Sequence, residues 1–299
     1  MIRSAAWAPF LSETELTMFL TLVEAEVRGH GIAYQMGDGI VEIEWQEGPQ
    51  SLGLSNLAQV CKSIPTSDWP TAIAKHFDLV FGSAAEELAL RSIVSDFDRV
   101  KTQLRVRLYE NWIDDYVLKH VSDGLAAALV FDLPSAMRSV SRAEMAAWRR
   151  SEDELFDFAM SNLEREEPPD SHIISGPEDV PITVVEGSSY YTASRALRLE
   201  RDLVPDGHPY GALVAVPNRH VFFHHLIEDG RVILAVNALV SLASEAHRRG
   251  PGSISDQVYW TRRGSLVRIP CSVRQGALHV SPPPLFIREV LDRLAAPPS

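Results

Sequence analysis

The stretch GALVAVPNRHVFFHH, residues 211–225, is the strongest strand signal in the chain. Two apolar runs flank the four residues PNRH. Because proline restricts φ and asparagine accepts turn geometry, this pattern predicts a β-hairpin. We expect an exposed tip that carries Asn218, Arg219 and His220.

Helical and strand-like segments alternate on both sides of this hairpin. Apolar residues at helical spacing predict helices near residues 12–28, 67–82, 84–100, 112–121, 141–148, 151–163, 192–203, 231–249 and 285–294. Apolar alternation or short apolar runs predict strands at 32–36, 40–45, 104–109, 126–133, 181–185, 257–261, 265–269, 271–274 and 277–280. Helices that alternate with antiparallel hairpins predict an α+β fold rather than a doubly wound parallel sheet.

Capping boxes predict where three of the helices begin. In this motif a serine and a glutamate three residues later bond each other's backbone amides. The three pairs are Ser12 with Glu15, Ser141 with Glu144, and Ser151 with Glu154. Residues 166–179 are rich in Pro, Asp, Glu and Ser, so we expect an exposed connection there.

The segment LRVRLY, residues 104–109, alternates cleanly between apolar and polar residues. Such alternation is typical of a strand with one buried face. We therefore expect Arg105 and Arg107 to face water.

The chain has 299 residues, which is enough for two domains of ordinary size. We predict an N-terminal α+β domain at 1–125 and a C-terminal α+β domain of similar size at 126–299. The formal net charge is −12. Acidic residues are spread over both halves, and no basic arm is present.

The even acidity argues against nucleic acid or anionic lipid as a partner, because both require a positive footprint. Cys61 and Cys271 stand far apart, and no CxxC spacing occurs, so the chain lacks a zinc-finger pattern. The N-terminal residues lack the features of a signal peptide. Together these features predict a soluble, cytoplasmic protein with reduced thiols and no membrane association.

Four pieces of sequence, in order, resemble the YtpQ-like family of uncharacterised bacterial proteins, which is grouped as a domain of unknown function. They are LVFDLPSAMRSVSRAEMAAW with the SEDELFDFAMSNLE that follows, YYTASRAL, GALVAVPNRHVFF, and VYWTRRGSLVRIP. The resemblance covers about residues 128–270. The family implies no established activity, and its usual acidic residue after the turn is His220 in this chain.

The chemical motifs of common enzymes are absent from the sequence. No GxSxG, no GxxxxGK[ST] and no GxGxxG occurs, so we predict no catalytic residues and no cofactor. Three histidines, His220, His224 and His225, lie close together in sequence. Strand parity puts His224 and His225 on opposite faces, and His220 is about 13 Å along the strand from His224, so we predict no metal site.

The segment YYTASRAL offers one possible ligand site. Thr192 or Ser189 could cap a helix whose amides suit an anion, with Arg195 one turn in and Tyr190 and Tyr191 at the entry. The alternative is a packed strand–helix junction in which Arg195 forms a structural salt bridge.

Two functions follow from these observations. The first is a non-catalytic interaction, adaptor or chaperone-like module with a protein partner or with a second copy of itself. The predicted helix at 231–249 supports this role because apolar residues cover most of its circumference. The alternative is a small-anion binder or enzyme whose site combines Arg195 with the hairpin tip; the six candidate ligand-binding residues are Tyr190, Tyr191, Arg195, Asn218, Arg219 and His220.

Overall fold

The computed structural model describes residues 6–45, 48–110, 116–203, 208–262, 264–274 and 277–295. Its contacts divide the chain into two compact units. Unit 1 holds residues 1–91, 134–136 and 248–251, and unit 2 holds the rest. The boundary expected at 125/126 would separate strands that pair with each other, because β6 (Leu125–Asp132) pairs with β4 (Leu104–Tyr109).

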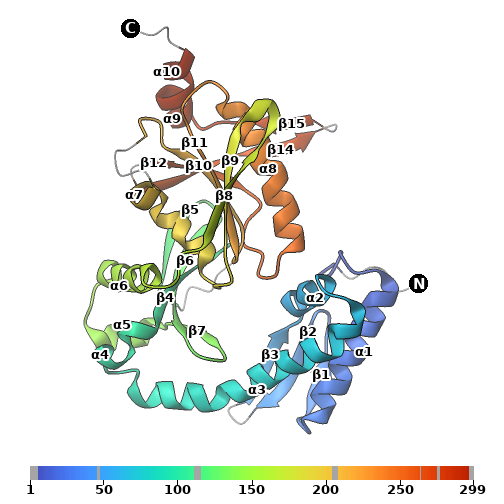
Figure 1. Cartoon of the computed structure of the whole chain (residues 1–299). Helices are drawn as coiled ribbons and strands as arrows, with labels where there is room; N and C mark the ends of the chain where they lie inside the picture. Colours follow the sequence, from blue (N-terminus) through green and yellow to red (C-terminus); the bar gives the residue numbers. More distant parts are fainter. Residues whose placement is uncertain are drawn as a thin grey trace. The chain divides into compact units, whose positions relative to one another are not determined.

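Unit 1 is a three-stranded antiparallel sheet with helices packed on it (Figure 1). The Ser12–Glu15 capping box is present at the start of the first helix, and apolar side chains such as Phe19 and Val23 form the core. Its elements are α1 (Glu13–Gly29), β1 (Tyr34–Met36), β2 (Ile40–Trp45), β3 (Gly48–Gly53), α2 (Ser55–Lys62), η1 (Thr66–Asp68) and α3 (Trp69–Ile93).

A single helix replaces the two helices predicted on either side of Gly82. α3 runs without interruption from Trp69 to Ile93, and Gly82 lies inside it, exposed to solvent. Glycine weakens a helix by about 1 kcal/mol, which one residue in a long helix tolerates. A short helix, α4 (Phe97–Val100), follows separately.

Unit 2 contains two main sheets, and helices pack between and around them (Figure 1). Both further capping boxes, at Ser141 and Ser151, are present as predicted. The elements after β4 are β5 (Leu118–Ser122), β6, β7 (Met137–Ser139), α5 (Arg142–Trp148), α6 (Glu152–Glu164), β8 (Asp170–Ser175), η3 (Pro177–Asp179), β9 (Pro181–Glu186), η4 (Thr192–Arg198), α7 (Leu199–Leu203), β10 (Ala212–Asn218), β11 (Val221–Leu226), α8 (Val232–Arg249), β12 (Val258–Arg262), β13 (Ser265–Ile269), β14 (Cys271–Arg274), β15 (Ala277–Val280), α9 (Pro284–Phe286), η5 (Ile287–Leu291) and α10 (Asp292–Ala295), and η2 (Lys101–Gln103) precedes β4.

The larger sheet is fully antiparallel, with the strand order β13-β12-β10-β11-β9-β8. Apolar side chains on one face pack against the buried side of α8. The opposite face of its central strands lies against η4, which in turn lies against β4 of the smaller sheet. The α+β fold class is therefore confirmed.

The predicted hairpin is β10–β11, at the centre of this sheet. All seven residues of β10 are buried, so the apolar run packs on both faces. Its tip, however, is not exposed as expected: Asn218 is only 5 % exposed, and Arg219 and His220 are half-buried. Gly252 covers the turn, where its carbonyl accepts the backbone N–H of Arg219 at 3.1 Å.

Two segments have a different structure from the one predicted. Residues 166–179 are exposed as expected, but they include β8, which forms an edge of the larger sheet. The second part of the helix predicted at 112–121 is β5, because its residues pair with β6. The first part, 112–115, lies outside the described residues.

Replacing Gly82 by alanine tests whether α3 is continuous. An added Cβ meets nothing within 4 Å, so we expect Gly82→Ala to raise the free energy of unfolding by about 1 kcal/mol. Gly31 is the matched control in the same unit. It also has open space around it, but its φ of +68° disfavours a side chain, so Gly31→Ala should destabilise. Urea-induced unfolding measures both; a helix break at Gly82 would make Gly82→Ala destabilising instead.

Candidate functional site

The loop of residues 187–191, GSSYY, joins β9 to η4 and carries two of the predicted ligand-binding residues. Ser189 shapes the loop: its Oγ accepts the N–H of Tyr191 at 3.2 Å, and its carbonyl accepts the hydroxyl of Thr192 at 3.0 Å. The two tyrosines have different environments as a result. Tyr190 is 49 % exposed, whereas Tyr191 is 3 % exposed.

Tyr191 connects the loop to the smaller sheet. Its hydroxyl donates to Asp132 Oδ1 at 2.7 Å, and burial together with this bond raises the pKa of Tyr191 well above its ordinary value. Tyr191 is therefore a neutral hydrogen-bond donor at physiological pH.

Arg105 extends the same network. Its Nε donates to Glu166 Oε1 at 2.5 Å, and its Nη2 lies 3.9 Å from Asp132 Oδ2. The side chain of Arg105 is only 14 % exposed, so the prediction that it faces water is wrong. The reason is that carboxylates from later in the chain lie above this face of β4.

Arg195 has a structural role at the end of α6. Its Nη2 donates to the carbonyls of Leu163 at 2.8 Å, Glu167 at 3.3 Å and Glu166 at 3.4 Å. These carbonyls belong to the last turn of the helix and the residues after it, which lack helical partners. The segment that carries Arg195 is moreover a 3-10 helix with no side-chain cap, rather than the capped α-helix expected.

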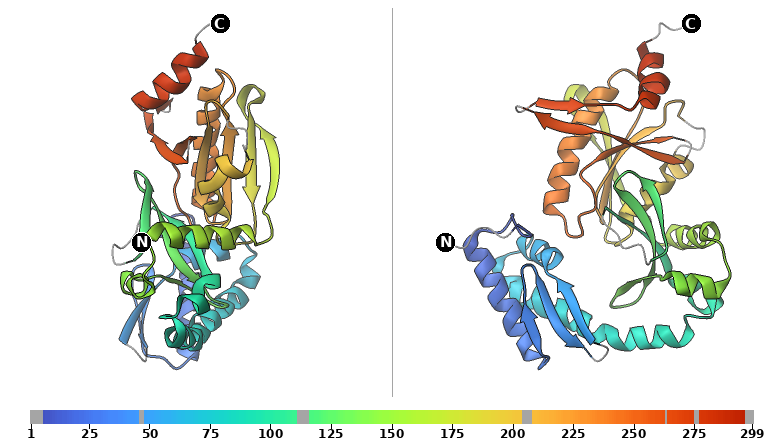
Figure 2. Two further views of the ribbon diagram at one scale, coloured as in Figure 1. Left: turned by 90° about the vertical axis from the view of Figure 1, so that its left-hand side faces the viewer. Right: turned by 180° about the vertical axis from the view of Figure 1, so that it is seen from behind.

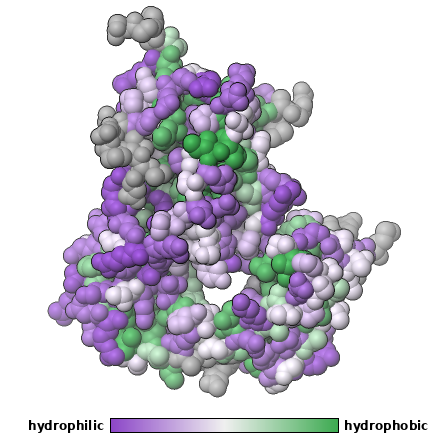
Figure 3. Space-filling model, viewed as in Figure 1, coloured by the Kyte–Doolittle hydropathy of each residue, from purple (hydrophilic) through white to green (hydrophobic). Residues whose placement is uncertain are grey.

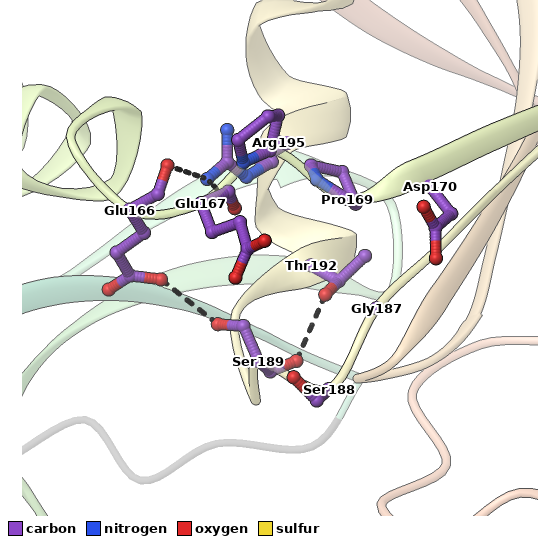
Figure 4. A pocket seen from close by; sticks show the side chains of 10 residues that line it. Glu166, Glu167, Pro169, Asp170, Gly187, Ser188, Ser189, Thr192 and Arg195 are labelled. Atoms are coloured by element: carbon purple, nitrogen blue, oxygen red, sulfur yellow. Dashed lines mark hydrogen bonds between the residues drawn. The ribbon is translucent and has the colours of Figure 1, made fainter.

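A polar pocket of about 320 Å³ lies between residues 166–170 and the GSSYY loop (Figure 4). Arg195 lines it, and so do three carboxylates. Glu166 is bonded to Arg105 and to the hydroxyl of Ser189. Glu167 and Asp170 have no ion-pair partner among the described residues, so the pocket suits a cationic group better than the anion expected from the sequence.

Arg219 forms a stack with the exposed tyrosine of the loop. Its guanidinium lies 4.1 Å from the centroid of the Tyr190 ring, and its Nε donates to His220 Nε2 at 2.9 Å. The other ring nitrogen of His220, Nδ1, donates to the carbonyl of Gly187 at 3.2 Å. Burial and the charge of Arg219 lower the pKa of His220, which keeps this ring neutral.

Asn218 holds the turn of the hairpin together. Its Oδ1 accepts the backbone N–H of His220 at 3.0 Å, and its Nδ2 donates to the carbonyl of Ala246 at 3.2 Å. Both polar atoms have a partner in the fold, so the amide is structural.

The structure thus brings Tyr190, Arg219 and His220 together. The polar groups of the other three predicted residues, Tyr191, Arg195 and Asn218, form hydrogen bonds that stabilise the fold. Arg219 is not among the residues that line the pocket beside Arg195. Sequence reasoning missed Arg107, whose charge lowers the pKa of Arg219 and of His220. The alternation of LRVRLY placed it on the same face as Arg105 but could not show what covers that face.

His224 and His225 lie on opposite faces of β11, as strand parity predicts. His225 Nδ1 donates to the carbonyl of Pro181 at 2.8 Å. His224 is 4 % exposed, and both its ring nitrogens are buried with no hydrogen-bond partner among the residues that the structure describes. Burial lowers the pKa of His224 to about 4.

Unit 1 contains the one group of metal-ligand type among the described residues. It consists of Glu26 and His30 at the end of α1 and Asp78 on α3. His30 Nε2 lies 3.2 Å from Glu26 Oε1 and 3.9 Å from Asp78 Oδ1. The i, i+4 spacing of Glu26 and His30 is visible in the sequence, whereas the approach of Asp78 is not. His30 Nε2 is already within hydrogen-bonding distance of Glu26 Oε1.

The outer edge of β8 is open. Figure 2 shows β8 as the outermost strand of its sheet, and among the described residues its backbone pairs with β9 alone. Gly176 N–H donates to the carbonyl of Val180 just beyond the strand, and the orientation of backbone groups alternates along an antiparallel pair. It follows that three residues direct both N–H and C=O outward: Ser171, Ile173 and Ser175.

The surface over β8 and β9 includes a small hydrophobic patch (Figure 3). The exposed large apolar side chain of this strand pair is Ile173, with 70 % of its surface accessible. It lies on the sheet face away from α8, since its neighbour Ile174 packs into the core with α8.

Comparisons with protein-family models, with curated proteins and with solved structures returned no match. The resemblance to the YtpQ-like family therefore stays a prediction. Among the described residues, none of the helices is both long enough and apolar enough to cross a membrane.

His224 makes stability depend on pH. The pKa of His224 is about 4 in the folded state, whereas its ordinary value of 6.5 applies in the unfolded chain. Between pH 6.5 and pH 4 the unfolded chain therefore binds a proton that the folded chain does not. The free energy of unfolding falls as the pH drops through this range. The complete loss amounts to about 3 kcal/mol. We expect His224→Leu to flatten this part of the pH profile and to keep or raise stability at pH 7, because two unpartnered nitrogens disappear.

His225→Leu is the matched control for that experiment. It leaves the carbonyl of Pro181 without its donor, so stability at pH 7 should fall by about 1–3 kcal/mol. Urea unfolding at several pH values measures both variants. A His224→Leu variant that keeps the parent's slope between pH 6.5 and 4 would contradict the assignment.

Proposed function

We propose that this protein binds an extended, basic segment of another protein, which adds as a strand to the outer edge of β8. The proposal gives a physical form to the non-catalytic interaction role expected from the sequence. The observation that carries it is the row of outward backbone groups at Ser171, Ile173 and Ser175.

An open edge of this kind is unusual, because natural sheets generally protect their edges. Lysine, proline, bulges or very short strands prevent unwanted pairing. β8 has six residues, contains neither lysine nor proline, and pairs with β9 in an unbroken register. The opposite edge of the same sheet, β13, lies against β5. Addition of a strand is a recurring way to recognise extended peptides.

The charge around β8 favours a basic occupant. Carboxylates flank both ends of the strand: Glu166, Glu167 and Asp170 at its start, and Glu178 and Asp179 after its end. A second copy paired antiparallel through β8 would bring these like-charged ends together. A segment with lysine or arginine would instead gain favourable interactions.

The acidic pocket supplies a site for one side chain of such a segment. It opens beside the first residue of β8 and contains the unpaired carboxylates of Glu167 and Asp170. A lysine or arginine near the end of the bound strand can reach these groups. Ile173 would contact an apolar residue further along the segment.

Fluorescence anisotropy with labelled ten-residue peptides tests this function. A peptide that alternates lysine with valine should bind, and its binding should weaken with added salt. A version with glutamate in place of lysine is the charge control and should not bind. Equal binding of the two peptides would overturn the proposal.

The variant Ile173→Pro removes one outward N–H of β8 and leaves the hydrogen bonds between β8 and β9 intact. A hydrogen bond contributes about 1 kcal/mol net, so this variant should weaken peptide binding about fivefold. Ile173→Val keeps the N–H and is the matched control, with affinity close to the parent's. Far-UV circular dichroism confirms that both variants fold. Unchanged affinity in Ile173→Pro would exclude pairing along β8.

A further inference from the structure

Arg107 lies in an environment that does not neutralise its charge. Its Nε is buried with no hydrogen-bond partner in the described part of the chain, and its Nη1 is 3.2 Å from the sulfur of Met137, which is a weak acceptor. The guanidinium is 4.9 Å from the centroid of the Tyr109 ring. The cross-strand neighbour of Arg107 on β6 is Ala128, whose side chain carries no polar group that could neutralise the guanidinium.

Arg219 is in a similar situation. It is half-buried between Tyr190 and His220, and burial lowers its pKa. The Nε of Arg219 donates to Nε2 of His220, and Nδ1 of His220 donates to the carbonyl of Gly187. This arrangement orients the guanidinium and leaves both Nη groups without an acceptor among the described residues.

Arg107 and Arg219 lie beside the same loop. Arg107 contacts Met137, the cross-strand neighbour of Asp132, and Asp132 accepts the hydroxyl of Tyr191 in the GSSYY loop. Tyr190, the preceding residue of that loop, stacks on the guanidinium of Arg219. Ala193, in the 3-10 turn after the loop, donates its N–H to the carbonyl of Arg219 at 3.2 Å. The positive charge of Arg107 also lowers the pKa of Arg219 and the pKa of His220.

Several other half-buried arginines of unit 2 have carboxylate partners, whereas Arg195 and Arg268 donate to backbone carbonyls and to Gln257. The arginine–carboxylate pairs are Arg105–Glu166, Arg138–Glu144, Arg198–Glu164 and Arg262–Glu289. In the part of the chain that the structure describes, no carboxylate lies within ion-pair distance of Arg107 or Arg219. Two like charges held together at a partly desolvated site cost free energy, which a bound anion would offset.

We propose that Arg107 and Arg219 bind a phosphate group, either free phosphate or the phosphate of a small phosphomonoester, at the open side marked by Tyr190. Planar guanidinium groups match the oxygens of phosphate and can donate two bonds each. A phosphate carries close to two negative charges at pH 7, so it suits two arginines better than a single carboxylate does. The site differs from the sequence-based expectation, because Arg107 takes the place of Arg195.

Thermal denaturation of the full chain, with titration calorimetry, tests the site at constant ionic strength. Inorganic phosphate and phenyl phosphate should raise the melting temperature, and acetate should not. Tighter binding of phenyl phosphate than of inorganic phosphate would identify an ester, which can stack on Tyr190, as the ligand; the reverse order would identify free phosphate.

Arg107→Gln and Arg219→Gln should each weaken phosphate binding at least tenfold. Because each removes one of two like charges, neither should lower the melting temperature in phosphate-free buffer. The control is Arg231→Gln, an exposed arginine paired with Asp229, which should respond to phosphate like the parent. An equal response to acetate, an unchanged phosphate affinity in both variants, or a marked loss of stability of both variants in phosphate-free buffer would overturn the proposal.

Discussion

Burial of the β10–β11 hairpin on both of its faces is the constraint on which the rest of unit 2 depends. Every residue of β10 is buried, so an element must cover each face. α8 covers one face with an apolar stripe. The other face is covered by η4, which brings the GSSYY loop and the β4–β6 sheet next to the hairpin turn.

The second covering layer is polar, and its polarity has consequences for function. Tyr191, Asp132, Arg105 and Glu166 form a connected network in which one guanidinium faces two carboxylates. Arg107 extends from the same strand face, but no carboxylate of the described residues lies within ion-pair distance of it. The phosphate site proposed at Arg107 and Arg219 and the acidic ends of β8 thus belong to one chain with a net charge of −12. The overall charge argued against nucleic acid as a partner, but it could not reveal either proposed site.

Several predictions failed for the same physical reason, which is that partners distant in sequence decided the outcome. Residues 166–179 have the composition of a loop, yet pairing with β9 makes part of them a strand. The turn of the central hairpin has exposed-looking residues, yet Gly252 and Ala246 cover it. The alternative site expected from the sequence combined Arg195 with Arg219, but Arg195 donates to carbonyls at and after the end of α6, and Arg219 does not line the pocket beside it.

The sequence by itself determined the features whose interactions are local. The capping boxes at Ser12, Ser141 and Ser151 join atoms three residues apart, and the central hairpin needs only a turn between two apolar runs. The open edge of β8 and the placement of Arg107 and Arg219 beside the GSSYY loop were decided only by the tertiary structure. These features depend on burial and charge supplied by segments tens of residues away, and no local pattern of residue types records which segments those will be.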